Sequence, residues 1–375
     1  MTEFDFNSPI DRYAQRALKY HYYPKDVLPL WIADSDYAVS PAIQTALASH
    51  AKQGVYGYQL AEHVTELNAS VVEWLARQHD WQIDPEWLVW VPGIMVGVNS
   101  CARALTKTGD VVHCQIPNYP PLHTVAKNNQ RHSLSFKTKG SPGAWQLDWQ
   151  DLEAQMQAHQ GGMMILTNPM NPCGAVMTKT ELERLAELCT QYDVLLCSDE
   201  VHCDLRLDDI KHTPAGSVKA LAERSVTLMS ASKTFNIAGL ATAYAIIPNK
   251  KLRKAFYHET VAQQHWVNSF GMQATIAALS ESDDWHAAQR QHLLANREYL
   301  YREINKISGL KYVKSPATYL AWINASGLDV PNVHQWFMDR GVGVSPGKDF
   351  GWENYVRLNF ACPRSHLELA IERLT

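Results

Sequence analysis

The chain of 375 residues lacks several features that would assign it to a specialised class of protein. It has no excess of one charge, because 34 Lys and Arg stand against 38 Asp and Glu, so nucleic acid is not an expected partner. No apolar run approaches the roughly 18 residues of a membrane-spanning helix, and the first residues lack the basic-then-apolar pattern of a signal peptide. We therefore expect a cytoplasmic protein without a membrane partner.

Paired cysteines are also missing. The seven cysteines are odd in number and include no pair with CxxC spacing, which favours reduced thiols over a disulfide framework or a zinc site. The stretch richest in metal-ligand residue types is HCDLRLDDIKH, at residues 202–212. It contains no histidines four residues apart, as one face of a helix would require, so we expect no metal.

The composition that is present suits a globular protein. Hydrophobic residues make up 46% of the chain and charged residues 19%, which is enough apolar surface for a sizeable core. The length exceeds what one compact core usually holds, so two domains are expected.

The middle of the chain alternates short apolar runs with amphipathic stretches. This pattern predicts a mainly parallel sheet covered by helices on both faces, an α/β fold. A helix over 178–192 begins with Thr178 and Glu181 in capping-box spacing, and another is predicted over 94–105. The predicted strands are 87–91, 111–116, 162–167, 194–200, 225–232 and 241–248.

The two ends of the chain have a different pattern. Residues 1–45 are rich in loops, while 283–375 contain a long helix followed by strand-like YLAWIN and VRLNF. We expect 1–45 and 283–375 to form a smaller α+β domain together, packed against a large domain at 46–282. A cleft between two such domains is a natural ligand site.

Polar residues close three of the predicted strands. Asn171 follows the strand over 162–167, Asp199 ends the next strand, and Lys233 follows the run SVTLMSAS. Ligands of such sheets bind at the carboxyl ends of the strands. An acid at one strand end more often caps a helix, but an amide, a carboxylate and an amine in this order indicate one site.

These residues lie in motifs that resemble a known family. The motifs, in chain order, are WIADSDY, GVYGY, NPMNPCG, SDEVH, SKTFNIAGL, YLAWI and VRLNFACPR. Together they resemble the fold-type I pyridoxal 5′-phosphate (PLP) enzymes of the class I/II aminotransferase superfamily, and within it the cystathionine β-lyase (C–S lyase) branch. The resemblance runs from about residue 28 to 365.

The resemblance implies a role for each residue of the trio. Lys233 would hold PLP as a Schiff base, and once freed its amine would take the substrate's α-proton. Asp199 would face the pyridine nitrogen and keep it protonated, which strengthens the ring as an electron sink. Asn171 would bond the ring's phenolic oxygen, and Tyr119 would stack on the ring face.

Other residues would hold the cofactor phosphate. The backbone N–H groups of Ile94 and Met95, at a predicted helix start, can face an anion. The resemblance adds the hydroxyls of Ser230 and Ser232. It also implies that Tyr58 reaches the phosphate of a neighbouring subunit, which makes a homodimer part of the site.

The substrate itself would be held by the small domain. By resemblance Arg357 anchors the α-carboxylate through both oxygens, with a second contact from the backbone at Ala33. His202 stands where aminotransferases often have tyrosine and is a candidate cofactor contact. Ala241 replaces an arginine of many aminotransferases, a departure shared with the C–S lyase branch.

Three functions follow from this pattern. The first is β-elimination from cystathionine or a related cysteine S-conjugate, which yields a thiol such as homocysteine, pyruvate and ammonia. The second is an aminotransferase acting on a hydrophobic or aromatic amino acid. The third is a non-catalytic PLP-binding regulatory protein, which the intact Lys233 and the missing basic patch disfavour.

Overall fold

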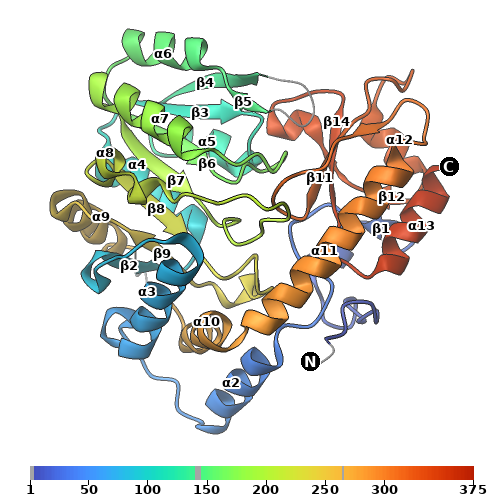
Figure 1. The fold of residues 1–375 in the computed structure, drawn as a ribbon, viewed down its shortest axis with the longest axis horizontal. Helices are drawn as coiled ribbons and strands as arrows, with labels where there is room; N and C mark the ends of the chain where they lie inside the picture. The colour runs from blue at the N-terminus through green and yellow to red at the C-terminus, as the bar shows by residue number, and fades with distance from the viewer. Residues whose placement is uncertain (1–3, 140–144, 264–265) are drawn as a thin grey trace.

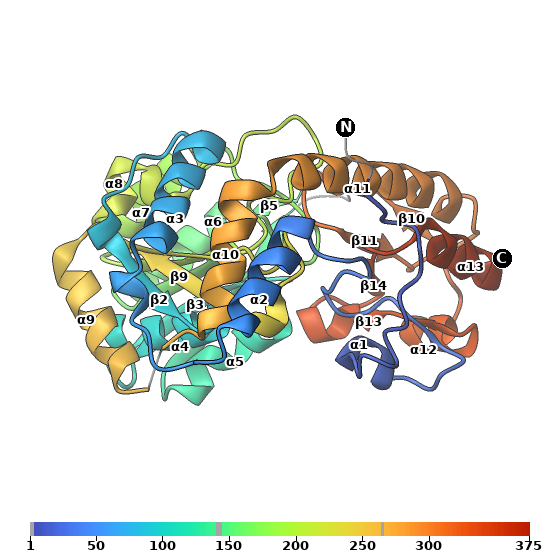
Figure 2. The ribbon, with the colours of Figure 1, turned by 90° about the horizontal axis from the view of Figure 1, so that it is seen from below.

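A computed structural model describes residues 4–139, 145–263 and 266–375. Figure 1 shows a large sheet with helices on both faces beside a smaller region built from the two ends of the chain. Turned by 90°, the same two regions lie side by side, and helix α11 (Asp283–Ile304) extends along the smaller one (Figure 2).

Over the ranges that the structure describes, the large sheet has eight strands. Its strands run parallel except β9 and the short edge strand β5, which confirms the predicted α/β fold with a mainly parallel central sheet. The strands are, in spatial order, β2 (Leu88–Val91), β9 (Ala243–Ile246), β8 (Ser225–Met229), β7 (Leu195–Asp199), β6 (Met163–Thr167), β3 (Val111–Ile116), β4 (His132–Lys139) and β5 (Gln146–Leu147).

Both faces of this sheet are apolar. The β6 sequence MMILT therefore does not alternate between apolar and polar residues. All its residues are buried, because successive side chains point to opposite faces that are both covered. Met163 and Ile165 pack in the cluster below α4 (Ile94–Leu105) and α9 (Lys250–Val261). Met164 and Leu166 pack against α6 (Trp149–Ala158) and α7 (Lys179–Gln191).

Further helices cover the sheet and join it to the smaller region. Helix α10 (Ser269–Glu281) packs between α2 (Pro41–Lys52) and α3 (Thr65–His79), in the hydrophobic cluster that continues into the smaller region. The remaining helices are α1 (Leu18–His21), α5 (Pro120–Asn128), α8 (Lys219–Ala222), α12 (Val333–Asp339) and α13 (Arg364–Leu374).

The smaller region joins distant parts of the chain. Strand β1 (Leu28–Pro29) pairs in parallel with β12 (Val342–Gly343). A four-stranded sheet has the order β10 (Lys311–Tyr312), β11 (Leu320–Asn324), β14 (Tyr355–Asn359) and β13 (Ser345–Pro346). The domain boundaries at residues 45 and 282 stay a prediction.

The structure differs from the sequence prediction in several elements. Helix α5 was not predicted, and the segment NYPP opens it with proline at its first positions. Strand β4 was missed, because its sequence HSLSFKTK is half exposed and polar. Strand β8 ends at Met229, three residues before the predicted end. Within the described ranges, no helix combines the length and apolar character that crossing a membrane requires.

Candidate active site

Asn171, Asp199 and Lys233 follow three neighbouring parallel strands. Strand β7 pairs with β6 on one side and β8 on the other, so the carboxyl ends of all three meet at one edge of the sheet. Asp199 is the last residue of β7, and Lys233 comes four residues after the end of β8. Asn171 lies in the buried turn after β6.

Lys233 has no carboxylate partner among the residues described. Its Nζ instead donates to the backbone oxygen of Ala33 at 2.8 Å, so two of the predicted site residues meet across the two regions. Burial lowers the pKa of the Lys233 amine, Asp34 and Asp199 oppose the change, and Arg357 adds to it. An amine with a lowered pKa is a better nucleophile and base near neutral pH.

Asp199 is a nearly buried carboxylate, 5% exposed, that forms no ion pair with any described residue. Its Oδ1 accepts one hydrogen bond, from the backbone N–H of Val201 at 3.2 Å. Burial raises the pKa of Asp199 to about 6, and the charge of Glu200 adds to this effect. A buried carboxylate without an ionic partner is stabilised by a cationic ligand atom.

Arg357 is a buried guanidinium, 4% exposed, in the middle of β14. Its Nη1 donates to Asn171 Oδ1 at 2.8 Å, and its Nη2 donates to the backbone oxygen of Trp31 at 2.8 Å. Its Nε is buried and has no hydrogen-bond partner among the described residues, and the centroid of the Phe350 ring lies 4.7 Å from its Cζ. Burial lowers the pKa of Arg357 to about 10, so it remains charged at neutral pH and suits an anionic ligand.

The segment over residues 31–37, which carries Ala33, is held by side chains from remote parts of the chain. Asn359 Nδ2 donates to the backbone oxygens of Ile32 and Asp34, at 2.6 and 2.8 Å. Sequence reasoning missed Asn359. The available signal was its place two residues after Arg357, which puts both on one face of a strand.

Two further predicted residues lie near the same charges. Tyr119 is the half-buried N-cap of α5, and burial raises the pKa of its hydroxyl, while the Arg357 charge opposes this. His202 is 2% exposed, no residue in the described part of the chain bonds its Nδ1, and its ring meets that of Tyr319 edge-on, with the ring centroids 6.0 Å apart. Burial lowers the pKa of His202 to about 3, helped by the charge of Lys233, so the imidazole is neutral.

The predicted phosphate donors come from the start of α4 and from the loop after β8. Helix α4 starts at Ile94 after Gly93 and has no side-chain cap, so the first backbone N–H groups, including that of Met95, lack intrahelical partners. Ser230 Oγ donates to the backbone oxygen of Thr242 at 2.7 Å and accepts from Ser232 N at 3.0 Å. The Ser230 proton is thus engaged within the loop, and the half-buried Ser232 is the hydroxyl left for an anion.

Tyr58 does not join the other predicted residues within one protomer. It is 91% exposed, and its ring meets that of Trp266 edge-on at 5.0 Å. Its predicted role needs a second subunit and stays a prediction.

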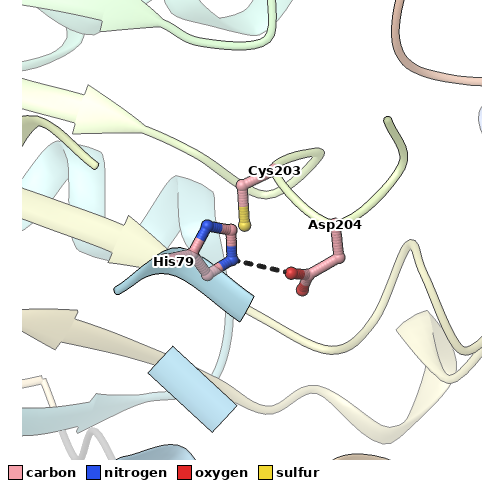
Figure 3. A group of neighbouring side chains, drawn as sticks. All are labelled: His79, Cys203 and Asp204. Carbon is pink, nitrogen blue, oxygen red and sulfur yellow. Dashed lines mark hydrogen bonds and ion pairs between the residues drawn. The ribbon is translucent and has the colours of Figure 1, made fainter. Parts of the chain in front are cut away.

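Part of the stretch 202–212 lies in a group that could bind a metal. His79, Cys203 and Asp204 are buried, and their ligand atoms lie within 4.8 Å of one another (Figure 3). The Asp204 Oδ1 already receives hydrogen bonds from His79 Nε2 at 2.8 Å and Trp74 Nε1 at 3.1 Å. These hydrogen bonds link α3 to the turn after β7.

Comparisons with known proteins cover nearly the whole chain. A family model described as aminotransferase class I and II matches residues 25–374. Cystathionine β-lyase PatB of Bacillus subtilis (strain 168) is 33% identical over 361 residues, which is 93% of this chain and 92% of that protein. The crystal structure of OvoB has a TM-score of 0.94 at 39% identity and covers 99% of this chain and 98% of its own. Cystalysin from Treponema denticola, whose structure contains a pyridoxal 5′-phosphate cofactor, has a TM-score of 0.94 at 26% identity and covers 100% and 98%.

Proposed function

The chain belongs to the class I and II aminotransferase family, and from that premise we propose that it is a PLP-dependent carbon–sulfur β-lyase. Its substrate is cystathionine or a related cysteine S-conjugate. The Cβ–S bond breaks, the thiolate leaves, and the remaining three-carbon unit yields pyruvate and ammonia after water adds.

The choice of β-elimination rests on the similarity to cystathionine β-lyase PatB. The observation that supports PLP-dependent chemistry is the set of three charged groups without ionic partners among the described residues. The amine of Lys233 fits an aldehyde, the carboxylate of Asp199 fits a protonated pyridine nitrogen, and the guanidinium of Arg357 fits a substrate carboxylate. Bound PLP would supply that aldehyde and an electron-withdrawing ring. Asn171 and Tyr119 would contact the ring, and His202, as a neutral imidazole, would face it.

The protein's own residues perform the binding and proton steps. Arg357 binds the α-carboxylate through its two Nη atoms, in place of part of its contacts to Asn171 and Trp31. The backbone at Ala33 offers the second carboxylate contact. The Lys233 amine, whose pKa burial lowers, takes the proton from the substrate α-carbon.

The phosphate would lie at the start of α4. The free N–H groups of Ile94 and Met95 and the positive end of the helix dipole favour an anion there. Ser232 adds a hydroxyl, while Ser230 braces the loop through Thr242.

The alternative function is an aminotransferase for a hydrophobic or aromatic amino acid, because the matching family model is named for that activity. A product assay separates the two. The purified protein with PLP and cystathionine, but no added keto acid, is expected to release pyruvate, ammonia and a thiol. Strict dependence on a keto acid would establish the alternative instead, and binding of PLP without turnover of any amino acid would indicate a regulatory protein.

We further propose that the working form is a homodimer. Tyr58 lies in an exposed apolar loop, where Val55 is 77% and Tyr56 is 52% exposed, so a second copy would bury this surface. Tyr58 would then reach the neighbouring subunit's phosphate site.

The compartment we propose is the cytoplasm. All seven cysteines are buried free thiols, as expected of a protein that works under reducing conditions.

A further inference from the structure

We propose that Glu200 and His212 are positioning residues, which hold Asp199 at the place where it meets the cofactor ring nitrogen. The inference rests on the proposed contact between Asp199 and PLP, and not on which reaction follows. Two neighbouring carboxylates at the end of β7, those of Asp199 and Glu200, differ in how many hydrogen bonds hold them.

Asp199 is weakly held by its own contacts. The carboxylate accepts one hydrogen bond from within the described residues, at 3.2 Å from Val201 N. Its direction therefore depends on the backbone that carries it, which leaves the sheet at this point. A group that must face a ligand atom needs support from its surroundings.

Glu200 provides a strong anchor for that backbone. Its side chain is completely buried, and its Oε1 accepts from Ser198 Oγ and from Ala215 N, both at 2.8 Å. Its Oε2 accepts from His212 Nε2 at 2.7 Å, and its backbone N–H donates to the oxygen of Leu228 on β8 at 2.9 Å. A buried carboxylate with this many donors is fixed in space, and Asp199 is covalently joined to it.

A second histidine–carboxylate pair lies at the far end of the same turn. His79 Nε2 donates to Asp204 Oδ1 at 2.8 Å, as Figure 3 shows, and the ring of His79 meets that of His212 edge-on at 5.5 Å. Both pairs are buried and use the same chemistry. Only the Glu200 pair adjoins Asp199 in the chain, so the Asp204 pair is a matched control.

The alternative is that both pairs only stabilise the fold. If Glu200 and His212 act through Asp199, their substitution must weaken the part of PLP binding that depends on the ring nitrogen of the cofactor. A PLP analogue whose ring nitrogen is replaced by C–H, 1-deaza-PLP, lacks the atom that Asp199 would contact. The ratio of the dissociation constants of PLP and 1-deaza-PLP therefore measures the contact between Asp199 and the ring nitrogen. A general loss of stability affects both constants alike and leaves their ratio unchanged.

The experiment titrates the apo forms of wild type, Glu200→Gln and Asp204→Asn with PLP and with 1-deaza-PLP, by absorbance and fluorescence. Wild type is expected to prefer PLP, and Glu200→Gln to lose about tenfold of that preference, as for other supports of a binding group. Asp204→Asn should keep the wild-type ratio while it lowers resistance to denaturant. An unchanged ratio in Glu200→Gln, or an equal fall in Asp204→Asn, overturns the proposal.

Two further variants complete the test. His212→Ala should reduce the preference and His212→Gln should restore it, because a glutamine amide can donate to Glu200 from a similar position. If His212→Gln behaves as His212→Ala, the positioning role fails. Asp199→Asn is the reference: if it keeps the full preference for PLP, then the proposed cofactor contact itself is wrong, which is a separate outcome.

Discussion

At the scale of single residues, the site is built from charged side chains in buried positions, where burial raises the free energy of the charged form. Asp199 ends a strand, Lys233 follows one and Arg357 lies in the middle of another. Burial penalises the charged form of each, and no described residue neutralises any of them by an ion pair. The sequence reveals Lys233 and Asp199 because they are charged residues at or just after the ends of apolar runs. It does not reveal Asn359 or Trp31, whose contributions are contacts to or from the backbone.

Replacing Arg357 with lysine should weaken substrate binding. Lysine keeps the charge but loses the planar fork, and one charge-assisted hydrogen bond is worth about 1.5–3 kcal/mol, or about a ten- to hundredfold rise in KM. Steady-state kinetics with cystathionine measures this. Arg364→Lys, seven residues later and bonded to Asn296, is the control and should leave KM unchanged.

Asp199 should make the apo-protein's stability depend on pH. Its pKa is raised to about 6, so its favourable contribution is complete below its ordinary pKa near 3.9 and is lost as pH rises through 6. Between pH 4 and 7 the free energy of unfolding of wild type should fall by about 2 kcal/mol relative to Asp199→Asn. Urea unfolding of both apo-proteins tests this, and parallel pH profiles would contradict it.

At the scale of elements, prediction succeeded where one local signal decides the structure. Helix α4 has its predicted bounds, and α7 begins with the predicted capping box at Thr178 and Glu181. Strand β4 gave no such signal, because it pairs near the edge of the sheet and exposes alternate residues. The fold class follows from the apolar runs, whereas the exact end of β8 depends on how Ser230 bonds to Thr242.

The turn that carries Asn171 depends on Gly174. This glycine has φ +72°, and a Cβ there would lie 2.3 Å from the backbone oxygen of Ala317. Gly174→Ala should cost about 2–5 kcal/mol of stability, from left-handed strain plus overpacking. Gly161→Ala, at φ +78° with open space around it, should cost only the strain, about 1–2 kcal/mol. Equal midpoints in denaturant for the two variants would show that the contact with Ala317 is unimportant.

At the scale of the whole molecule, the site unites segments that no local pattern connects. Asn359 binds the carbonyl of Ile32, and Lys233 binds that of Ala33. Sequence order alone cannot supply such contacts, because they depend on how the two ends of the chain pack on the large sheet. The resemblance between motifs supplied expected roles for Lys233 and Ala33 but neither of these two contacts, and it added the expectation that Tyr58 reaches a neighbouring subunit.

Mixed dimers test whether Tyr58 completes a neighbour's site. Lys233→Ala and Tyr58→Phe homodimers should each have low activity. After co-expression or subunit exchange, heterodimers contain one site with both native residues, so activity should recover. No recovery in heterodimers that are purified through two different tags would place Tyr58 outside the site.

The central claim is that the amine of Lys233 is the covalent attachment point of PLP. The most direct measurement treats the holoprotein with borohydride, digests it and locates the reduced pyridoxyl label by mass spectrometry. The account predicts the label on Lys233, and a Lys233→Ala protein that carries none and has lost turnover. A label on another lysine, or undiminished turnover in Lys233→Ala, would contradict it.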